Sequence, residues 1–270
     1  MVYVVAVSLY AALALTAALS AASAYFYRRS IVLFGAVIAG SIVILAVAAA
    51  FGQYQYFMAA FAAGGMAGWV AISSARRSRH GENARLERRR DAVHIFIGVA
   101  AIALFAGAGI QVARYVLLAS VIALYTLNAA LNRFRRSKAA KALLALERPD
   151  AVYGEGAALL AFGVLIVTSL IGSGSYIYFA LIALLFGDAS ATIVGTYLGK
   201  VKMPYSRRKS VAGTAAFFIV VGALGFPFVG WYALPFALAL ALLESVETRI
   251  DDNALVAVGL LAIYAVMALA

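Results

Sequence analysis

Residues 187–213 read G-D-A-S-A-T-I-V-G-T-Y-L-G-K-V-K-M-P-Y-S-R-R-K-S-V-A-G and place an acid, Asp188, inside an otherwise apolar segment. A face of small residues follows the acid, and a short loop with five Lys and Arg follows that face. A carboxylate within hydrocarbon is costly, so an acid in this setting beside cations indicates a functional site by default. We expect the rest of the chain to form the frame that holds this site at one membrane face.

Apolar residues dominate the whole chain, which has 270 residues, 66% of them hydrophobic and 12% charged. Repeated apolar runs of about 20 residues exclude a soluble globular domain and predict an all-α, polytopic integral membrane helical bundle. The first run lacks a positively charged start, so we expect a retained span rather than a signal peptide. The absence of cysteine excludes disulfides, thiolate zinc sites and a cysteine nucleophile.

The apolar segments predict about 10 (9–10) transmembrane helices in a single integral membrane domain, 1–270. They lie at 2–27, 31–52, 54–75, 92–110, 112–132, 152–171, 174–199, 211–226, 230–247 and 254–270. Of the 22 Lys and Arg, 21 lie in connections after odd-numbered segments, and Arg114 is the exception. The positive-inside rule then predicts a multi-pass protein of the cell membrane with these loops, and its site, facing the cytoplasm. The net charge of +11 records this topology, so we expect no nucleic-acid partner.

The small face that follows the acid has helical spacing. Asp188, Thr192, Gly195 and Gly199 are spaced by four, three and four residues, so they share one face of a helix. Close helix packing through the G-x-x-x-G pair explains the glycines. It does not explain Asp188, which lies about 18 Å before Lys200 along an ideal helix and needs a cavity, a metal or a cation partner.

The loop that follows carries Lys200, Lys202, Arg207, Arg208 and Lys209. Its proline prevents a continuous helix, and the run Ser210-x-x-Gly213 returns the chain to the membrane. Cations beside a helix start form a phosphate-binding arrangement, through charge and free backbone N–H groups. Ordinary topological charge is the alternative interpretation, and the neighbouring acid favours the site.

A second polar group lies near the C-terminal end of the chain and contains Glu244, Glu247, Asp251, Asp252 and Asn253. Oxygen ligands of this kind suit Mg²⁺, which uses one or two carboxylates together with phosphate oxygens and water. A solvated acidic turn is the alternative. The two polar groups together predict a magnesium–phosphate site.

A third group lies at the entry to the fourth apolar segment, where Glu87, Asp91, His94 and Gly98 follow heptad spacing and Arg90 lies one turn before His94. A catalytic and a structural role for this histidine are equally open.

These residues resemble the CTP-dependent lipid-alcohol kinases, the family of dolichol kinase, phytol kinase and the CTP-using diacylglycerol kinase. The shared pattern is G-D-A-x-A-x-x-x-G-x-x-x-G-K, then x-P and K-S-x-x-G, then a late Glu and D-N. In this chain the pattern falls on Gly187, Asp188, Ala189, Ala191, Gly195, Gly199, Lys200, Pro204, Lys209, Ser210, Gly213, Glu244, Asp252 and Asn253. The resemblance covers about 85–270, whereas 1–84 holds N-terminal spans without a motif. The family's upstream E-x-x-R-K-x-x-H fits Glu87, Arg90 and His94, with Asp91 in place of the Lys.

The resemblance implies a Mg²⁺-dependent membrane kinase that transfers the γ-phosphate of CTP to the hydroxyl of a long-chain isoprenoid alcohol of the dolichol or polyprenol type. Its expected metal ligands are Asp188, Glu244, Asp252 and Asn253. The nucleotide and phosphates are expected at Lys200, Arg208, Lys209, Ser210, Gly195, Gly199 and Gly213. The expected catalytic residues are Asp188, Lys209 and His94, and a second carboxylate remains open as the base. CTP follows from the resemblance alone.

Two alternatives belong to other classes. A CTP:lipid-phosphate cytidylyltransferase also pairs membrane acids with a K-x-x-G loop, but its P-G-H-G-G-x-x-D-R-x-D signature is absent here. A transporter would place polar residues near the membrane midplane between related halves, whereas here they gather towards one face. The identity of the alcohol and the oligomeric state stay open.

Overall fold

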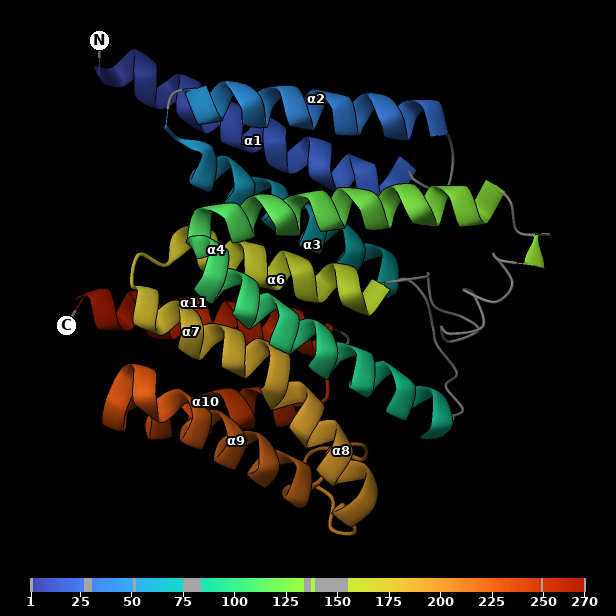
Figure 1. Cartoon of the computed structure of the whole chain (residues 1–270), viewed down its shortest axis with the longest axis vertical. Helices are drawn as coiled ribbons and strands as arrows, with labels where there is room; N and C mark the ends of the chain where they lie inside the picture. Colours follow the sequence, from blue (N-terminus) through green and yellow to red (C-terminus); the bar gives the residue numbers. More distant parts are fainter. Residues whose placement is uncertain are drawn as a thin grey trace. The chain divides into compact units, whose positions relative to one another are not determined.

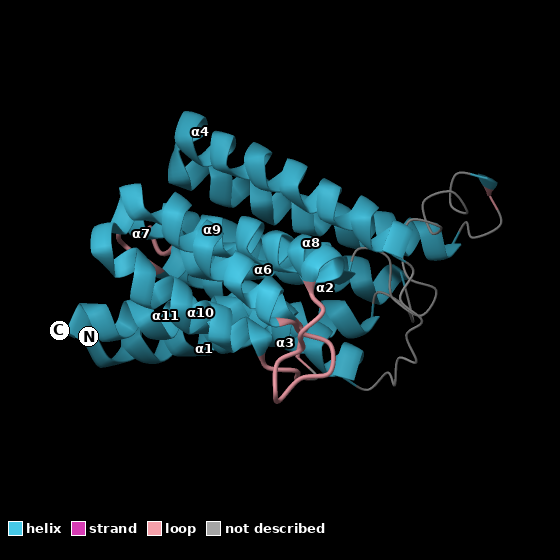
Figure 2. Cartoon of the chain, turned by 90° about the horizontal axis from the view of Figure 1, so that it is seen from below, coloured by secondary structure: helices cyan, strands magenta, loops and turns pink. Residues whose placement is uncertain are grey.

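The computed structural model describes residues 2–26, 31–50, 52–74, 84–133, 137–138, 155–248 and 250–269. These residues are 89% helical and contain no strand, which confirms the prediction of an all-α protein. Figure 2 shows the described helices joined by loops. An apolar chain in hydrocarbon must satisfy its backbone N–H and C=O groups internally, and a helix does so within one segment.

The described helices follow the apolar segments of the sequence, and Figure 1 labels the α-helices among them. They are α1 (Val2–Phe26), α2 (Ile31–Ala50), α3 (Tyr54–Ser74), α4 (Ala84–Arg133), α6 (Glu155–Leu170), α7 (Gly174–Ile182), the π-helix η1 (Ala183–Gly187), α8 (Asp188–Leu198), α9 (Val211–Val229), the 3₁₀ turn η2 (Gly230–Tyr232), α10 (Ala233–Ser245) and α11 (Asp252–Leu269). The predicted segment 230–247 therefore begins with a tight turn and becomes α-helical three residues later.

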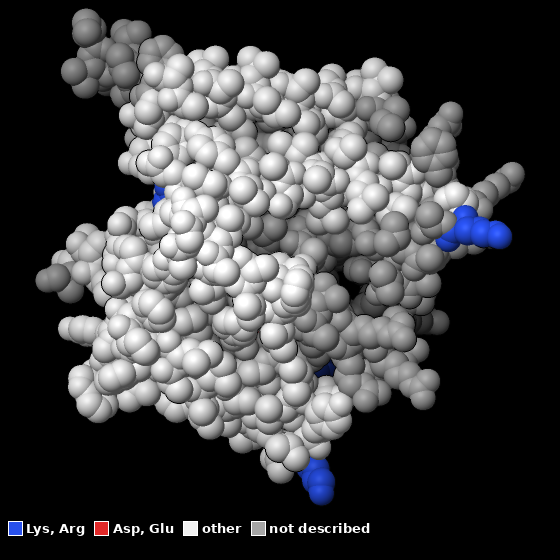
Figure 3. All heavy atoms as spheres, in the orientation of Figure 1, with Lys and Arg blue, Asp and Glu red and all other residues white. Residues whose placement is uncertain are grey.

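Five described stretches are long and apolar enough to cross a membrane, as expected of an integral membrane protein. They are Val32–Ala50, Ile95–Leu127, Gly174–Leu198, Val211–Ser245 and Asp252–Leu269. The face drawn in Figure 3 agrees with this setting, because its described atoms are almost all uncharged.

Two of these stretches, of 33 and 35 residues, would each be about 50 Å long as straight helices, well beyond the hydrocarbon thickness of about 30 Å. Each is interrupted by a glycine with positive φ, Gly109 (83°) in the first and Gly230 (59°) in the second. The predicted count of nine or ten spans is not confirmed by these lengths.

The chain divides into two compact units, Met1–Ser78 with Arg114–Leu170, and Arg79–Ala113 with Ile171–Ala270. In the first unit α3 packs against α1 and α6. Tyr125 is buried there, accepts a hydrogen bond of 2.8 Å from Trp69 Nε1 and packs against the ring of Phe162. Arg114 is also buried and donates to the carbonyl oxygen of Thr168, near the end of α6.

The second unit contains every residue of the predicted site. Within it α9 and α10 form a helical hairpin, against which α7, η1 and α11 pack. Gly230 allows the hairpin turn because a residue without Cβ reaches positive φ at low cost. At the same end of the unit, the Tyr176 hydroxyl donates to the carbonyl oxygen of Leu260 at 3.0 Å, which ties α7 to α11.

Small residues let α8 lie against the start of α9. A Cβ on Gly195 would lie 3.2 Å from Ser210 Oγ, and a Cβ on Gly199 would overlap the Ser210 side chain. A Cβ on Gly213 would lie 2.8 Å from the carbonyl oxygen of Ala191. The small face predicted from the sequence therefore forms the contact between these two helices.

The substitution Gly213→Ala tests this contact. We expect it to destabilise the purified protein by about 1–3 kcal/mol, because the added methyl meets backbone on α8 that cannot move without separating the helices. The measurement is the thermal unfolding midpoint in detergent.

Gly107→Ala is the matched control, since Gly107 lies in α4 and a Cβ added there would meet nothing within 4 Å. Ala is the better helix former, so this variant is expected to be neutral or slightly stabilised. Equal midpoints for the two variants would show that the α8–α9 contact is not tight.

Candidate metal and phosphate site

Asp188 begins α8 directly after the π-helix η1, and it is half-buried. A π-turn inserts an extra residue into the helical repeat and changes the direction in which the following side chains project. Ser190 Oγ donates to the carbonyl oxygen of Gly187, the last residue of this turn, at 2.7 Å. The acid therefore lies at an irregular point of the membrane segment.

Three carboxylates meet at this point, and each comes from a different helix. Glu244 lies in the last turn of α10 and is buried, with 2% of its side chain exposed, while Asp252 opens α11. One carboxylate oxygen from each of Asp188, Glu244 and Asp252 lies within 4.8 Å of the others. The structure thus brings together three of the four residues predicted as metal ligands, from positions up to 64 residues apart in the chain.

These three residues fit a divalent cation by their chemistry. Hard oxygen donors are the ligands that Mg²⁺ takes, usually one or two carboxylates with water or phosphate completing the octahedron. Like charges at this separation repel one another, so a cation bound among the three carboxylates would relieve their repulsion.

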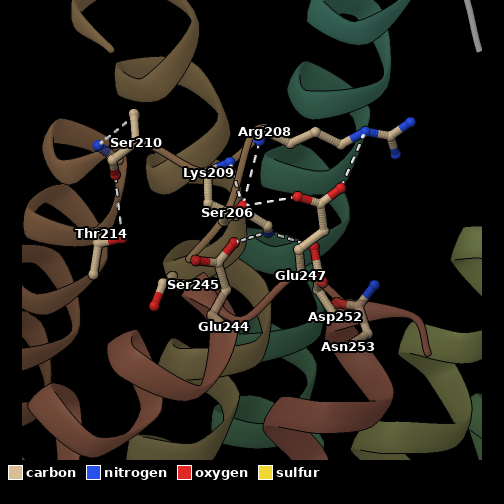
Figure 4. Close-up of polar contacts among 12 residues, drawn as sticks. Ser206, Arg208, Lys209, Ser210, Thr214, Glu244, Ser245, Glu247, Asp252 and Asn253 are labelled. Carbon is tan, nitrogen blue, oxygen red and sulfur yellow. Dashed lines mark hydrogen bonds and ion pairs between the residues drawn. The ribbon is translucent and has the colours of Figure 1, made fainter. Parts of the chain in front are cut away.

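Lys209 supplies a cation to this cluster from the loop between α8 and α9. Its ammonium donates to Asp252 Oδ2 at 2.6 Å and to Glu244 Oε1, as Figure 4 shows. Burial lowers the pKa of Lys209, but the carboxylates of Asp252 and Glu244 outweigh burial and raise it, so the lysine stays charged. Among the residues that the structure describes, none forms an ion pair or hydrogen bond with the carboxylate of Asp188.

The loop between the two helices folds back on itself, so that Lys209 reaches the acids. Met203 N–H donates to the carbonyl oxygen of Lys209 at 3.0 Å, and Val211 N–H donates to that of Val201 at 3.0 Å. Lys202 and Ser210 form an isolated antiparallel bridge at the base of the loop. Pro204 lies in the turn at the far end of the loop, where its fixed φ suits a turn.

A group of contacts that the sequence did not indicate attaches this loop to the connection between α10 and α11. Buried Ser206 donates to Glu247 Oε2 at 3.1 Å, and its Oγ accepts the backbone N–H groups of Arg208 and Lys209. Arg207 N–H also donates to Glu247 Oε2, at 3.0 Å, and Arg208 Nε lies 3.8 Å from Oε1 (Figure 4). We call Ser206 and Glu247, with the N–H groups they bind, the loop clamp.

A second attachment lies beside the clamp, where the hydroxyls of Tyr205 and Ser245 are 2.6 Å apart. Single Ser and Tyr residues in a polar loop carry no periodic or motif signal, so sequence reasoning missed them. The sequence indicated Glu247 as one acid of the C-terminal group, but it did not indicate that Ser206 is its partner.

The residues predicted to bind nucleotide have different surroundings, and several of them make helix caps or helix contacts. Ser210 is the N-cap of α9, where its Oγ accepts the N–H of Gly213 at 3.1 Å, so it is engaged in helix capping. The glycines at 195, 199 and 213 form the α8–α9 contact. Lys200 is exposed at the end of α8, and Arg208 is turned towards Glu247. Phosphate contacts by these residues stay predictions.

Asn253 and Asp251 lie at the start of α11. The backbone N–H of buried Asn253 donates to Asp251 Oδ1 at 3.0 Å, and the Asn253 side chain also hydrogen-bonds this acid. Burial raises the pKa of Asp251 to about 6, and the carboxylates of Asp252 and Asp188 add to the effect. Asn253 therefore supports the acid beside the cluster, and its role as a ligand stays a prediction.

His94 lies in α4, but its side chain and those of Glu87 and Arg90 are outside the described part of the structure. One turn further on, a Cβ on Gly98 would lie 3.0 Å from Leu185 Cβ, so this helix passes close to η1. The catalytic role predicted for His94 stays a prediction.

The loop clamp leads to a pH dependence. The N–H of Arg207 and the Ser206 hydroxyl lower the pKa of exposed Glu247, so ionised Glu247 stabilises the loop. This stabilisation is complete above the ordinary glutamate pKa of about 4.3 and is lost as the pH falls through the lowered value. We expect amide protection over residues 205–209, measured by hydrogen exchange, to fall at acidic pH.

Glu247→Gln should show weaker protection at pH 7 and should lack the acidic step, because an amide is a poorer acceptor than a carboxylate. The exposed neighbour Thr248, whose hydroxyl bonds within its own turn, supplies the control Thr248→Ala. The same pH profile in wild type and Glu247→Gln would contradict the clamp.

Comparison with known proteins gives one sequence relative. The chain is 39% identical over 113 residues to an uncharacterised protein of Methanocaldococcus jannaschii, a match that covers 41% of this chain and 58% of that protein. The chain thus spans a little over half the length of this relative. No family model and no solved structure matches the chain.

Proposed function

We propose that the protein is a Mg²⁺-dependent kinase that transfers the γ-phosphate of CTP to the hydroxyl of a long-chain isoprenoid alcohol. The observation that carries the proposal is the meeting of Asp188, Glu244 and Asp252 with the ammonium of Lys209 at the ends of apolar helices. These four residues belong to the motif shared with the CTP-dependent lipid-alcohol kinases. The nucleotide base and the class of alcohol rest on that resemblance.

The arrangement suits phosphoryl transfer because this reaction needs positioning and charge neutralisation more than covalent chemistry from the protein. When bound by Asp188, Glu244 and Asp252, Mg²⁺ would supply neutralising charge for the phosphate oxygens of the nucleotide. Lys209 and Arg208 lie on the same loop and would bind the phosphates directly. The clamp holds the backbone of this loop, so both side chains project from a fixed backbone position.

The transfer forms a bond between the alcohol oxygen and the γ-phosphorus and breaks the bond from that phosphorus to the β-phosphate oxygen, with CDP as the leaving group. The hydroxyl proton passes to a base of the chain, for which His94 and a carboxylate of the cluster are both candidates. The alcohol arrives from the lipid, and apolar side chains exposed around the loop favour this route. They are Tyr197, Leu198, Val201 and Tyr205.

The proposed location of the site is the cytoplasmic face of the cell membrane. The cations of the sequence lie almost wholly in connections on one side, and the loop with Lys209 is one of these connections. CTP is a cytoplasmic nucleotide, so a site on this side would meet its substrate directly.

The variant Asp188→Asn tests the metal role. We expect it to insert normally in membranes and to lower kcat/KM for lipid phosphorylation by about 100-fold or more, as loss of one electrostatic contact in the transition state does. Thr196→Ala is the control, because Thr196 lies two turns along α8 with an exposed side chain and is expected to retain full activity. Retained activity in Asp188→Asn would remove Asp188 from the site.

A second experiment tests the reaction itself. Membranes containing the protein are incubated with γ-labelled CTP or ATP and a panel of dolichol, shorter polyprenols, phytol, geranylgeraniol and diacylglycerol. We expect label in an isoprenoid monophosphate, with CDP as the other product, and most of the rate lost with ATP.

The products separate the proposal from its alternatives. Pyrophosphate and a CDP-lipid would identify a cytidylyltransferase, and equal use of CTP and ATP would contradict the family assignment. No labelled lipid with any alcohol would contradict a lipid kinase.

A further inference from the structure

The ammonium of Lys209 is bound to two of the three carboxylates that a divalent cation would use. It donates to Asp252 Oδ2 at 2.6 Å and to Glu244 Oε1, and both carboxylates belong to the group whose oxygens lie within 4.8 Å of one another. Magnesium binds oxygen at about 2.0–2.1 Å and requires near-octahedral geometry. An ammonium and a magnesium ion bound by the same two carboxylates would be neighbours of like charge at short distance, so they compete for these groups.

We propose that Lys209 is a built-in counter-cation, which occupies Glu244 and Asp252 while no divalent cation is bound and leaves them when one binds. The inference rests on the metal site of the proposed function. It adds that metal binding is an exchange of one cation for another and that this exchange frees the ammonium of Lys209.

Charge explains why the chain needs such a residue. Three carboxylates converge, and Glu244 among them is 2% exposed, so a cluster without any cation would hold an unpaired buried charge at high cost. One ammonium neutralises one of three charges and contacts two of the acids. Asp188 has no partner among the described side chains, so the arrangement with lysine leaves negative charge that a divalent cation would neutralise further.

The loop is built so that the side chain of Lys209 can move alone. Its backbone N–H is held by Ser206 Oγ at 3.0 Å, and its carbonyl oxygen accepts from Met203 N–H at 3.0 Å. Rotation about the four-carbon side chain therefore moves the ammonium without unfolding the loop. The freed ammonium remains next to Arg208, where the phosphates are proposed to bind. Binding of the metal would therefore make the ammonium of Lys209 available to bind phosphate.

The experiment measures binding of Mn²⁺ alone, in the absence of nucleotide and lipid, to the full chain in detergent. Mn²⁺ takes the same oxygen ligands as Mg²⁺, and electron paramagnetic resonance reports its free concentration. Removal of the competing ammonium in Lys209→Met should tighten Mn²⁺ binding by about tenfold or more, since a hydrogen bond to a charged group no longer opposes it. Lys209→Gln, which keeps a donor on a side chain one atom shorter but removes the charge, should also bind Mn²⁺ more tightly than wild type.

Arg207→Met is the matched control, because it removes one positive charge from the same loop at an exposed side chain. Its Mn²⁺ affinity gives the contribution of long-range charge, which we expect to be less than about threefold because solvent and salt screen it. Thermal unfolding adds an independent measurement. Without metal, Lys209→Met should unfold at a lower temperature than Arg207→Met, and added Mn²⁺ should raise the unfolding midpoint of Lys209→Met by more.

The outcomes separate this inference from the proposed function. If wild type binds Mn²⁺ through Asp188, so that Asp188→Asn loses it, but both Lys209 variants bind no more tightly than Arg207→Met, then exchange is wrong and the metal site stands. If Lys209→Met binds more weakly, the lysine helps to hold the metal and exchange is again wrong. If no form binds Mn²⁺ saturably, the metal site itself is overturned, and exchange with it.

Discussion

The second unit depends on one electrostatic constraint. Three carboxylates at the ends of apolar helices repel one another, and a cation must offset this repulsion. Asp188, Glu244 and Asp252 approach within 4.8 Å, and such a cluster is stable only with positive charge among its members. The ammonium of Lys209 provides that charge. The loop must therefore fold back towards the helix ends, although its other cations are exposed.

The structure of the loop follows from this requirement. Glycines at 195, 199 and 213 allow α8 and α9 to approach closely, which brings the two ends of the loop together. Ser210 begins α9 by capping it, and Ser206 and Glu247 fix the residues immediately before Lys209. Helix packing, the helix cap and the loop clamp together fix the backbone from which the ammonium of Lys209 reaches the acids.

Sequence reasoning succeeded for the fold class and for the acids that approach one another, and it had a physical basis in each case. Long apolar runs have few structural solutions, so the all-α fold could be predicted. An acid in hydrocarbon is rare enough to be noticed, which directed attention to Asp188 and Glu244. The clamp escaped prediction because a hydrogen bond between Ser206 and Glu247, 41 residues apart, leaves no local pattern. The glycines show a different limit of sequence reasoning, because their spacing fits both a packing face and a nucleotide-binding motif. The structure shows the packing role, since Ser210 lies against these glycines.

By itself, the sequence determined that this chain is helical and membrane-embedded and that its charged groups gather in a few connections. These properties depend on hydrophobicity and local periodicity, which the order of residues contains directly. Only the tertiary structure decided that three acids share one centre, that Lys209 rather than the adjacent Arg208 is the cation among them, and that Glu247 holds the loop. Those contacts join residues distant in the chain, and their geometry depends on how the helices pack rather than on any segment alone.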